Sequence, residues 1–402
     1  MSLEAEFDAV PTMECRVCQT EVPAGAFCGL CGGHLTPEPG DGPQWLRPGT
    51  FGAAPDESLL RPSIASSLFP QLPQRSRTPF RVGLALIVVG LAVFAVLKIP
   101  AALITVAALG LPLLFLLYLA ESDAYRDLPA RVLAIAAVFG AALGVGYVLL
   151  TGEMVARSYG VPMAAGLAMH HVMREGLVIP AGAMLLMLVP VVLVRLLPYK
   201  PREVLDGFVI GALASLMFAA GATLTRLAPQ FATGLFAHSR PIKGLIVEAA
   251  ICGVTIPLTA AAAGGAFGMA LWFRGQTGNP HENPGRVRAL LFGFAAVILV
   301  AHVAVGVVDI VGLPQLVMLT IHAVMTLLAL LLLRVAVQIA LLHEAHDPVS
   351  FTDPLLCVHC EHVVPDMAFC PACGAATRAS SRTSRADRRR SRPVRTVATE
   401  GQ

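Results

Sequence analysis

The sequence predicts an all-α polytopic membrane bundle of about eight transmembrane helices, with a small four-cysteine module near each end. The 402-residue chain is 56% hydrophobic and only 14% charged, whereas an ordinary soluble domain is about 25% charged. Residues 82–342 hold 15 Lys/Arg and 10 Asp/Glu, while the other 141 residues hold the remaining 30 charges and eight of the nine cysteines. This composition argues against an ordinary cytosolic enzyme.

The uneven distribution of charge and cysteine divides the chain into five segments. In order, we expect an N-terminal four-cysteine module at 1–36, a Pro/Gly-rich linker at 37–80, a transmembrane domain at 81–342, a second module at 343–377 and an Arg-rich disordered tail at 378–402.

The two cysteine modules are copies of one unit. Each has two CxxC pairs separated by nine residues, and the shared Val-Pro, Ala-Phe and Gly positions extend the repeat beyond the cysteines. Two CxxC knuckles complete a tetrahedral site of four thiolates, which suits structural Zn²⁺. A module of about 25 residues needs that metal to fold, because it buries too little apolar surface alone. The predicted ligands are Cys15, Cys18, Cys28 and Cys31 in the first module, and Cys357, Cys360, Cys370 and Cys373 in the second.

Both modules resemble small bacterial zinc ribbons, and we interpret them as structural or partner-binding sites. The alternative is a set of disulfides or a redox pair, which matched four-cysteine clusters disfavour. His34 and His359 are expected to be bystanders, since four cysteines already fill the tetrahedron. Phe27 and Phe369 are expected to pack against the knuckles. Reduced thiolates imply a cytosolic location for both ends.

The linker and the tail are predicted from composition. Residues 37–80 contain nine prolines, which favours a flexible or partly extended tether. From Arg378 to Arg395 there are eight arginines and one acid, Asp387. Such a run favours a disordered segment on anionic lipid at the cytoplasmic leaflet. A plain solvated tail is an open alternative, and nucleic acid is the less favoured partner.

Eight apolar runs are long enough to cross a bilayer, which needs about 20 residues per helix. They are approximately 82–97, 101–120, 131–150, 176–197, 204–225, 244–273, 287–308 and 315–342. Lys98-Ile99-Pro100 predicts a tight hairpin between the first two. An even number returns both ends to one side, and the flanks on that side hold twelve Lys/Arg against six on the other. The positive-inside rule then predicts the cytoplasmic (inner) membrane with both termini cytoplasmic. High Ala, Arg and Gly favour a bacterial source.

Ionisable residues at membrane depth are the default functional candidates. Glu175 and Glu248 lie near the outer ends of helices, and His302, Asp309 and His322 lie in or after the last two. Each also has an ordinary interpretation, as a snorkelling side chain or an interhelical hydrogen bond. Cys252 is interpreted as a buried, inert thiol.

One stretch resembles a known family. Residues Asp206-Gly207, Val209, Gly211 and Phe218-Ala219 resemble the D-G-x-V-x-G and F-A motifs of the PrsW family of glutamic-type intramembrane proteases, related to CAAX- and bacteriocin-processing enzymes. In that family, carboxylates and histidines activate water for peptide cleavage inside the membrane.

The resemblance implies positions for those catalytic groups. Glu175 aligns with one family glutamate, and His302 with Asp309 resembles the last histidine motif, for which His322 is the alternative match. Ala222 and Thr223, however, stand where the family has its next Glu and Asn. Hydrolysis needs a general base and a general acid, and alanine supplies neither. The resemblance therefore implies a helical core that has lost its catalytic residues.

Three functions follow from these observations. The favoured one is a non-enzymatic membrane scaffold, a pseudoprotease whose cytosolic zinc ribbons bind a membrane or cytosolic protein. The second is an active intramembrane protease with an altered metal or glutamate site. The third is a small-solute transporter, which the Gly-rich, Pro-broken sixth span (Pro257, Gly264, Gly265 and Gly268) makes conceivable.

Overall fold

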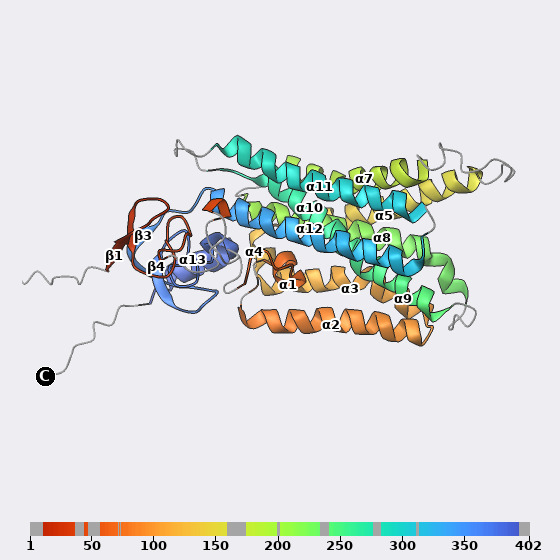
Figure 1. Cartoon of the computed structure of the whole chain (residues 1–402), viewed down its shortest axis with the longest axis horizontal. Coiled ribbons are helices and arrows are strands. Elements are labelled where there is room, and N and C mark those ends of the chain that lie inside the picture. The colour runs from red at the N-terminus through yellow and green to blue at the C-terminus, as the bar shows by residue number, and fades with distance from the viewer. Residues whose placement is uncertain are drawn as a thin grey trace, which may run out of the picture.

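The computed structural model places eight long apolar helices in one bundle, with a small metal-binding unit and a short helix at one end (Figure 1). It describes residues 11–36, 44–46, 57–70, 72, 74–158, 174–198, 202–233, 241–275, 283–310 and 313–393. The spans are Ser76–Val96, Pro100–Glu121, Ala130–Gly152, Gly176–Leu196, Val204–Phe231, Ile242–Trp272, Pro284–Gly306 and Gln315–His343. The predicted fold class and the predicted number of spans are confirmed.

Most spans correspond to one helix each. They are α2 (Gln74–Val96), α3 (Pro100–Glu121), α5 (Ala130–Ser158), α7 (Ile179–Leu196), α8 (Val204–Leu227), α11 (Pro284–Ile310) and α12 (Gln315–His343). The sixth span combines α9 (Ile242–Ala250), the π-helical turn η4 (Ile251–Thr255) and α10 (Ile256–Trp272). A second π-helical turn, η2 (Arg174–Val178), precedes α7, and the 3₁₀ segment η3 (Ala228–Thr233) follows α8. Short helix α4 (Ala124–Asp127) lies between α3 and α5.

The predicted α2–α3 hairpin is present. Helix α2 ends at Val96, Lys98 takes a left-handed conformation with φ of 55°, and Pro100 opens α3. Proline suits the first position of a helix because its missing N–H would have no intrahelical partner there.

Helix α8 is the centre of the bundle and is buried along most of its length. Gly207 and Gly211 face Gly268 and Gly264 of α10 so closely that a Cβ added at Gly207 or Gly211 would lie 2.4 or 2.0 Å from the opposite carbonyl oxygen. Two facing small-xxx-small pairs allow this backbone approach. The glycines that suggested a transporter, and those of the D-G-x-V-x-G motif, therefore serve helix packing.

The linker prediction is wrong for much of residues 44–80. Residues 44–46 form η1, residues 64–68 form α1, and α2 starts at Gln74. Leu59, Leu68, Phe69 and Leu72 are almost completely buried against the bundle.

Arg334 of α12 holds this segment in place. Its guanidinium is fully buried and donates to the Leu59 carbonyl (3.0 Å), Ser66 Oγ (2.5 Å) and Glu57 Oε2 (3.2 Å). A buried Arg that could not pair would be strongly destabilising, so these polar partners explain why a proline-rich segment is fixed at this position.

The predicted disorder of the tail is also wrong as far as residue 393. Residues 377–379 form η5 and Arg382–Arg390 form α13, which Ser381 caps by accepting a hydrogen bond from the Ser384 N–H. Several of its arginines contact carboxylates elsewhere in the chain (described below) instead of remaining in solvent. Residues 394–402 lie outside the described residues.

Candidate functional site: two metal centres and an intramembrane cavity

Each four-cysteine module has the geometry of a metal centre. The first ribbon (residues 11–36) contains β1 (Thr12–Glu14) paired antiparallel with β2 (Glu21–Pro23), and the second ribbon (residues 350–377) contains β3 (Ser350–Leu356) paired with β4 (Val363–Asp366). Within each ribbon the four sulfur atoms lie within 4.8 Å of one another. None of the nine cysteines, all of which the structure describes, forms a disulfide.

The sulfur spacing fits a tetrahedral ion. The Sγ–Sγ distances are 3.7 Å for Cys15–Cys31, 3.8 Å for Cys18–Cys28, 3.9 Å for Cys357–Cys373 and 3.8 Å for Cys360–Cys370. A tetrahedron with metal–sulfur bonds near 2.3 Å has edges of about 3.8 Å. The chain therefore has two four-cysteine centres that fit a tetrahedral metal ion, and neither cluster includes His34 or His359. Burial lowers the pKa of His359 to about 4, so that imidazole is neutral at pH 7.

The repeat extends to the local backbone. In each ribbon the first cysteine accepts from the residue four positions later, Gln19 or Glu361, and that residue has a positive φ. The second knuckle ends at Gly32 or Gly374, each with φ of 71°. Left-handed backbone favours glycine, which explains why both copies have Gly at this position.

The two ribbons pack against each other in a reciprocal way. The Phe27 N–H donates to the Pro371 carbonyl and the Phe369 N–H donates to the Gly29 carbonyl, both at 2.9 Å. In the 342-residue repeat, Phe369 corresponds to Phe27 and Pro371 to Gly29, so the two hydrogen bonds are equivalent. The ribbons therefore form a pseudo-two-fold pair within one chain.

The aromatic rings complete this pairing. A Cβ added to Gly374 would lie 2.7 Å from the Phe27 ring, and one added to Gly32 would lie 3.0 Å from the Phe369 ring. Each phenylalanine does pack on a knuckle, but on that of the other ribbon. This contact requires both ribbons to be on the same side of the bundle, as the even number of spans predicts.

The arginine segment (residues 378–392) joins the second ribbon to the start of α8. Arg385, with 4% of its side chain exposed, contacts Glu203 and Asp347 at 2.5 and 3.1 Å. Arg382 lies 3.3 Å from Asp206. Glu203 and Asp206 also form the capping box of α8. The aspartate of the D-G-x-V-x-G motif therefore caps a helix and binds an arginine.

Two further carboxylates complete this junction. The Val204 N–H donates to Glu344 Oε1 at 2.8 Å, and Arg378 lies 3.2 Å from the same oxygen. Burial raises the pKa of Glu344 to about 7 against the opposing charge of Arg378. Burial alone would raise the pKa of Asp347, but Arg385 and Arg378 hold it below its ordinary value.

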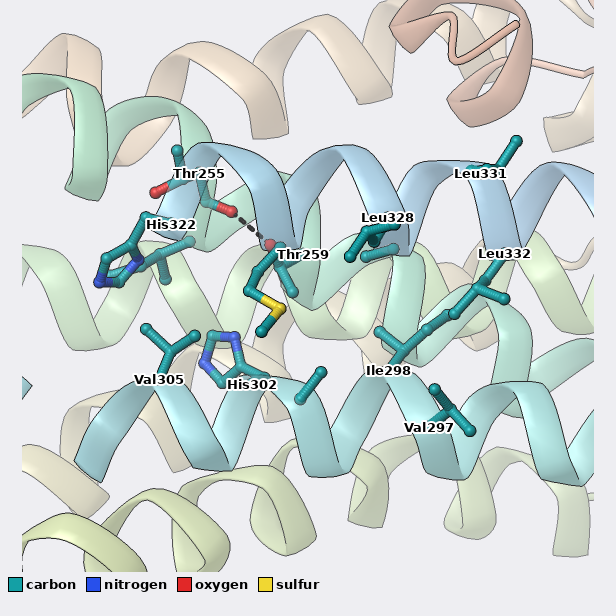
Figure 2. Close-up of a pocket in the computed structure, with 14 residues that line it drawn as sticks. Thr255, Thr259, Val297, Ile298, His302, Val305, His322, Leu328, Leu331 and Leu332 are labelled. Atoms are coloured by element: carbon teal, nitrogen blue, oxygen red, sulfur yellow. Dashed lines mark hydrogen bonds between the residues drawn. The ribbon is translucent and has the colours of Figure 1, made fainter. Parts of the chain in front are cut away.

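A second candidate site lies inside the bundle. One cavity of about 290 Å³ between α10, α11 and α12 is lined by His302, His322, Thr255 and Thr259 among apolar side chains. Figure 2 shows both imidazoles projecting into the space between α11 and α12. Both histidines also line an adjoining cavity of about 170 Å³. Pockets of this kind, apolar with a few polar groups, are the usual form of a binding site.

The cavities bring together some of the residues predicted from sequence. Ala222, Thr223, His302 and His322 line the smaller cavity, as does Cys252. Neither cavity is lined by a carboxylate among the residues that the structure describes. The side chains of Glu175 and Asp309 lie outside the described part. Glu248 is absent from both described linings and accepts a hydrogen bond from Gln230 at 3.2 Å.

Sequence reasoning missed the carboxylates that hold the arginine segment, and it missed Arg226, Thr223 and Tyr147 as cavity residues. A signal was available for Arg226, a charge at the end of an otherwise apolar span. The carboxylates gave none, because their partners are distant in sequence.

Comparison with known proteins yields no match to a family model, to a curated protein or to a solved structure.

Proposed function

We propose that the protein is a membrane scaffold that binds a partner protein through its paired ribbons. One observation carries the proposal: the metal-built pair is fixed to the end of the bundle yet leaves apolar side chains exposed outside it. Phe351, Leu356 and Val363 of β3 and β4 are 44%, 44% and 56% exposed, and Leu356 lies opposite Val363 in the strand register. Exposed apolar groups clustered on a small unit are typical of a protein contact.

The metal and the location belong to the same proposal. Four thiolates at tetrahedral spacing favour Zn²⁺, which needs no further ligand in a structural site. Reduced thiolates and the excess of Lys/Arg on the ribbon side favour the cytoplasmic face of an inner membrane. The ribbon pair would then meet cytosolic partners or the cytosolic parts of other membrane proteins.

Site-specific photocrosslinking in intact membranes tests the scaffold. A photoreactive residue at Phe351 or Val363 is expected to yield a discrete crosslinked protein, while the same residue at exposed Thr20 of the first ribbon serves as the matched control. Leu356→Ser with Val363→Ser should reduce the crosslink at Phe351 at least fivefold without loss of bound zinc. Equal crosslinking from all positions, or none from β3 and β4, would refute the proposal.

An intramembrane protease is the second candidate, because Ala222, Thr223, His302 and His322, far apart in sequence, line one cavity. Its weakness is chemical, since alanine at 222 leaves no acid or base at the position where the resembling family has glutamate. The reconstituted protein can be incubated with transmembrane peptides alongside His302→Ala. Cleavage that disappears in His302→Ala would favour the protease, and no cleavage by either protein is the result we expect.

A further inference from the structure

The two intramembrane cavities form a path with graded polarity. They share His302, His322, Val305 and Ile256, so one leads into the other. The smaller contains polar side chains of Tyr147, Thr223 and Arg226. The larger continues between Val297, Ile298, Leu328 and Leu332. The path is thus charged at one end and purely apolar at the other.

The polar end lies near the membrane face opposite the ribbons. Arg226 is exposed one residue before the end of α8. At 1.5 Å per residue, Thr223 lies about 6 Å, His322 about 10 Å and His302 about 12 Å from the ends of their helices on that side. A bilayer has a hydrocarbon core of about 30 Å within a total of about 40–45 Å. These side chains are therefore at the level where lipid headgroups and ester carbonyls meet the acyl chains.

The backbone around this path is irregular at the same depth. The turn η4, which contributes Cys252 and Thr255 to the linings, is π-helical. π-Helical turns inside α-helices occur frequently at functional sites. Here the turn widens the helix beside the two histidines.

We propose that this path binds one anionic phospholipid from the leaflet opposite the ribbons. The phosphate would lie at Arg226, the ester carbonyls would accept hydrogen bonds from the histidine N–H groups and the Thr223 hydroxyl, and one acyl chain would occupy the apolar cavity. A cavity of 150 Å³ holds a benzene molecule, so about 290 Å³ suffices for roughly twice as many carbons of one chain. A lipid needs no carboxylate in the site, which agrees with the described linings.

Native mass spectrometry of the full-length protein in detergent tests this assignment. Phosphatidylglycerol and phosphatidylcholine with identical acyl chains are titrated separately. We expect one phosphatidylglycerol per chain to survive detergent removal and phosphatidylcholine to be retained at least tenfold less. Arg226→Gln should lower phosphatidylglycerol retention about tenfold, whereas Arg286→Gln, an exposed arginine near the opposite end of α11, should not.

A second variant tests the apolar end. Ala301 lines the larger cavity, and Ala301→Phe should exclude the acyl chain and lower retention of both lipids while the zinc content stays at two per chain. Equal retention of the two lipids in every variant would mean annular lipid only and would overturn the proposal. Equal losses from Arg226→Gln and Arg286→Gln would also overturn it, because general surface charge would then explain the binding.

Discussion

The two ribbons share a metal site but are held in place differently. Their cysteines, strand pairs and positive-φ residues coincide at a constant offset of 342 residues. The second ribbon is followed by the arginine segment, which fixes it to Glu203, Asp206 and Glu344 of the bundle. The first ribbon is joined to the second through reciprocal contacts of Phe27 and Phe369. The metal folds each copy, whereas the sequence around the copies determines where each copy attaches.

This difference establishes a hierarchy of attachment. Removing the second ribbon should also release the first from the bundle, whereas removing the first should leave the second attached. Each prediction below tests this order.

Loss of one metal site should give the largest effect. Apparent binding energies of structural Zn²⁺ in small fingers are about 10–16 kcal/mol at pH 7, so Cys15→Ser or Cys357→Ser should each unfold its own ribbon and leave about one zinc per chain. Limited proteolysis should differ between them. Cys357→Ser should expose residues 11–36 as well as 350–377 to cleavage, while Cys15→Ser should expose only the first ribbon.

Metal analysis of the same samples provides the control. The hierarchy fails if Cys15→Ser exposes the second ribbon as much as Cys357→Ser exposes the first, since attachment would then depend equally on both copies.

Loss of the buried arginine should have the next largest effect. Arg385→Met removes the partner of Glu203 and Asp347 at a side chain that is 4% exposed, and breaking a buried ion pair costs about 3–5 kcal/mol. We expect hydrogen exchange in the second ribbon to rise more than a hundredfold while both zinc ions stay bound. Arg390→Met is the matched control, because Arg390 is 77% exposed and pairs with Asp387 on its own helix. If the two variants exchange alike, the arginine segment does not hold the ribbon.

The sequence predicted features that depend on neighbouring residues. Ligand spacing within 17 residues identified both metal sites, and apolar runs identified the eight spans. The arginine segment was interpreted as disordered because its partners Glu203 and Asp206 are more than 170 residues away. Arg334 was counted only as a flanking charge for the same reason. The 342-residue repeat showed that two ribbons exist, but it could not show that Phe27 packs on Gly374.

The reciprocal ribbon contact should respond equally to changes in either copy. Gly32→Ala and Gly374→Ala each place a Cβ at φ of 71° and within 3.0 Å of the opposite phenylalanine ring. A left-handed backbone costs an L-residue roughly 1–2 kcal/mol. Both variants should therefore raise hydrogen exchange in the first ribbon about tenfold while the second ribbon stays attached through Arg385. Gly146→Ala, where a Cβ meets nothing within 4 Å, controls for the substitution itself. Because Gly374 lies in the second ribbon and its ring partner Phe27 in the first, the comparison separates pairing from local folding. If Gly374→Ala loosens only the second ribbon, the glycine supports its own knuckle and the two copies are not held by a shared contact.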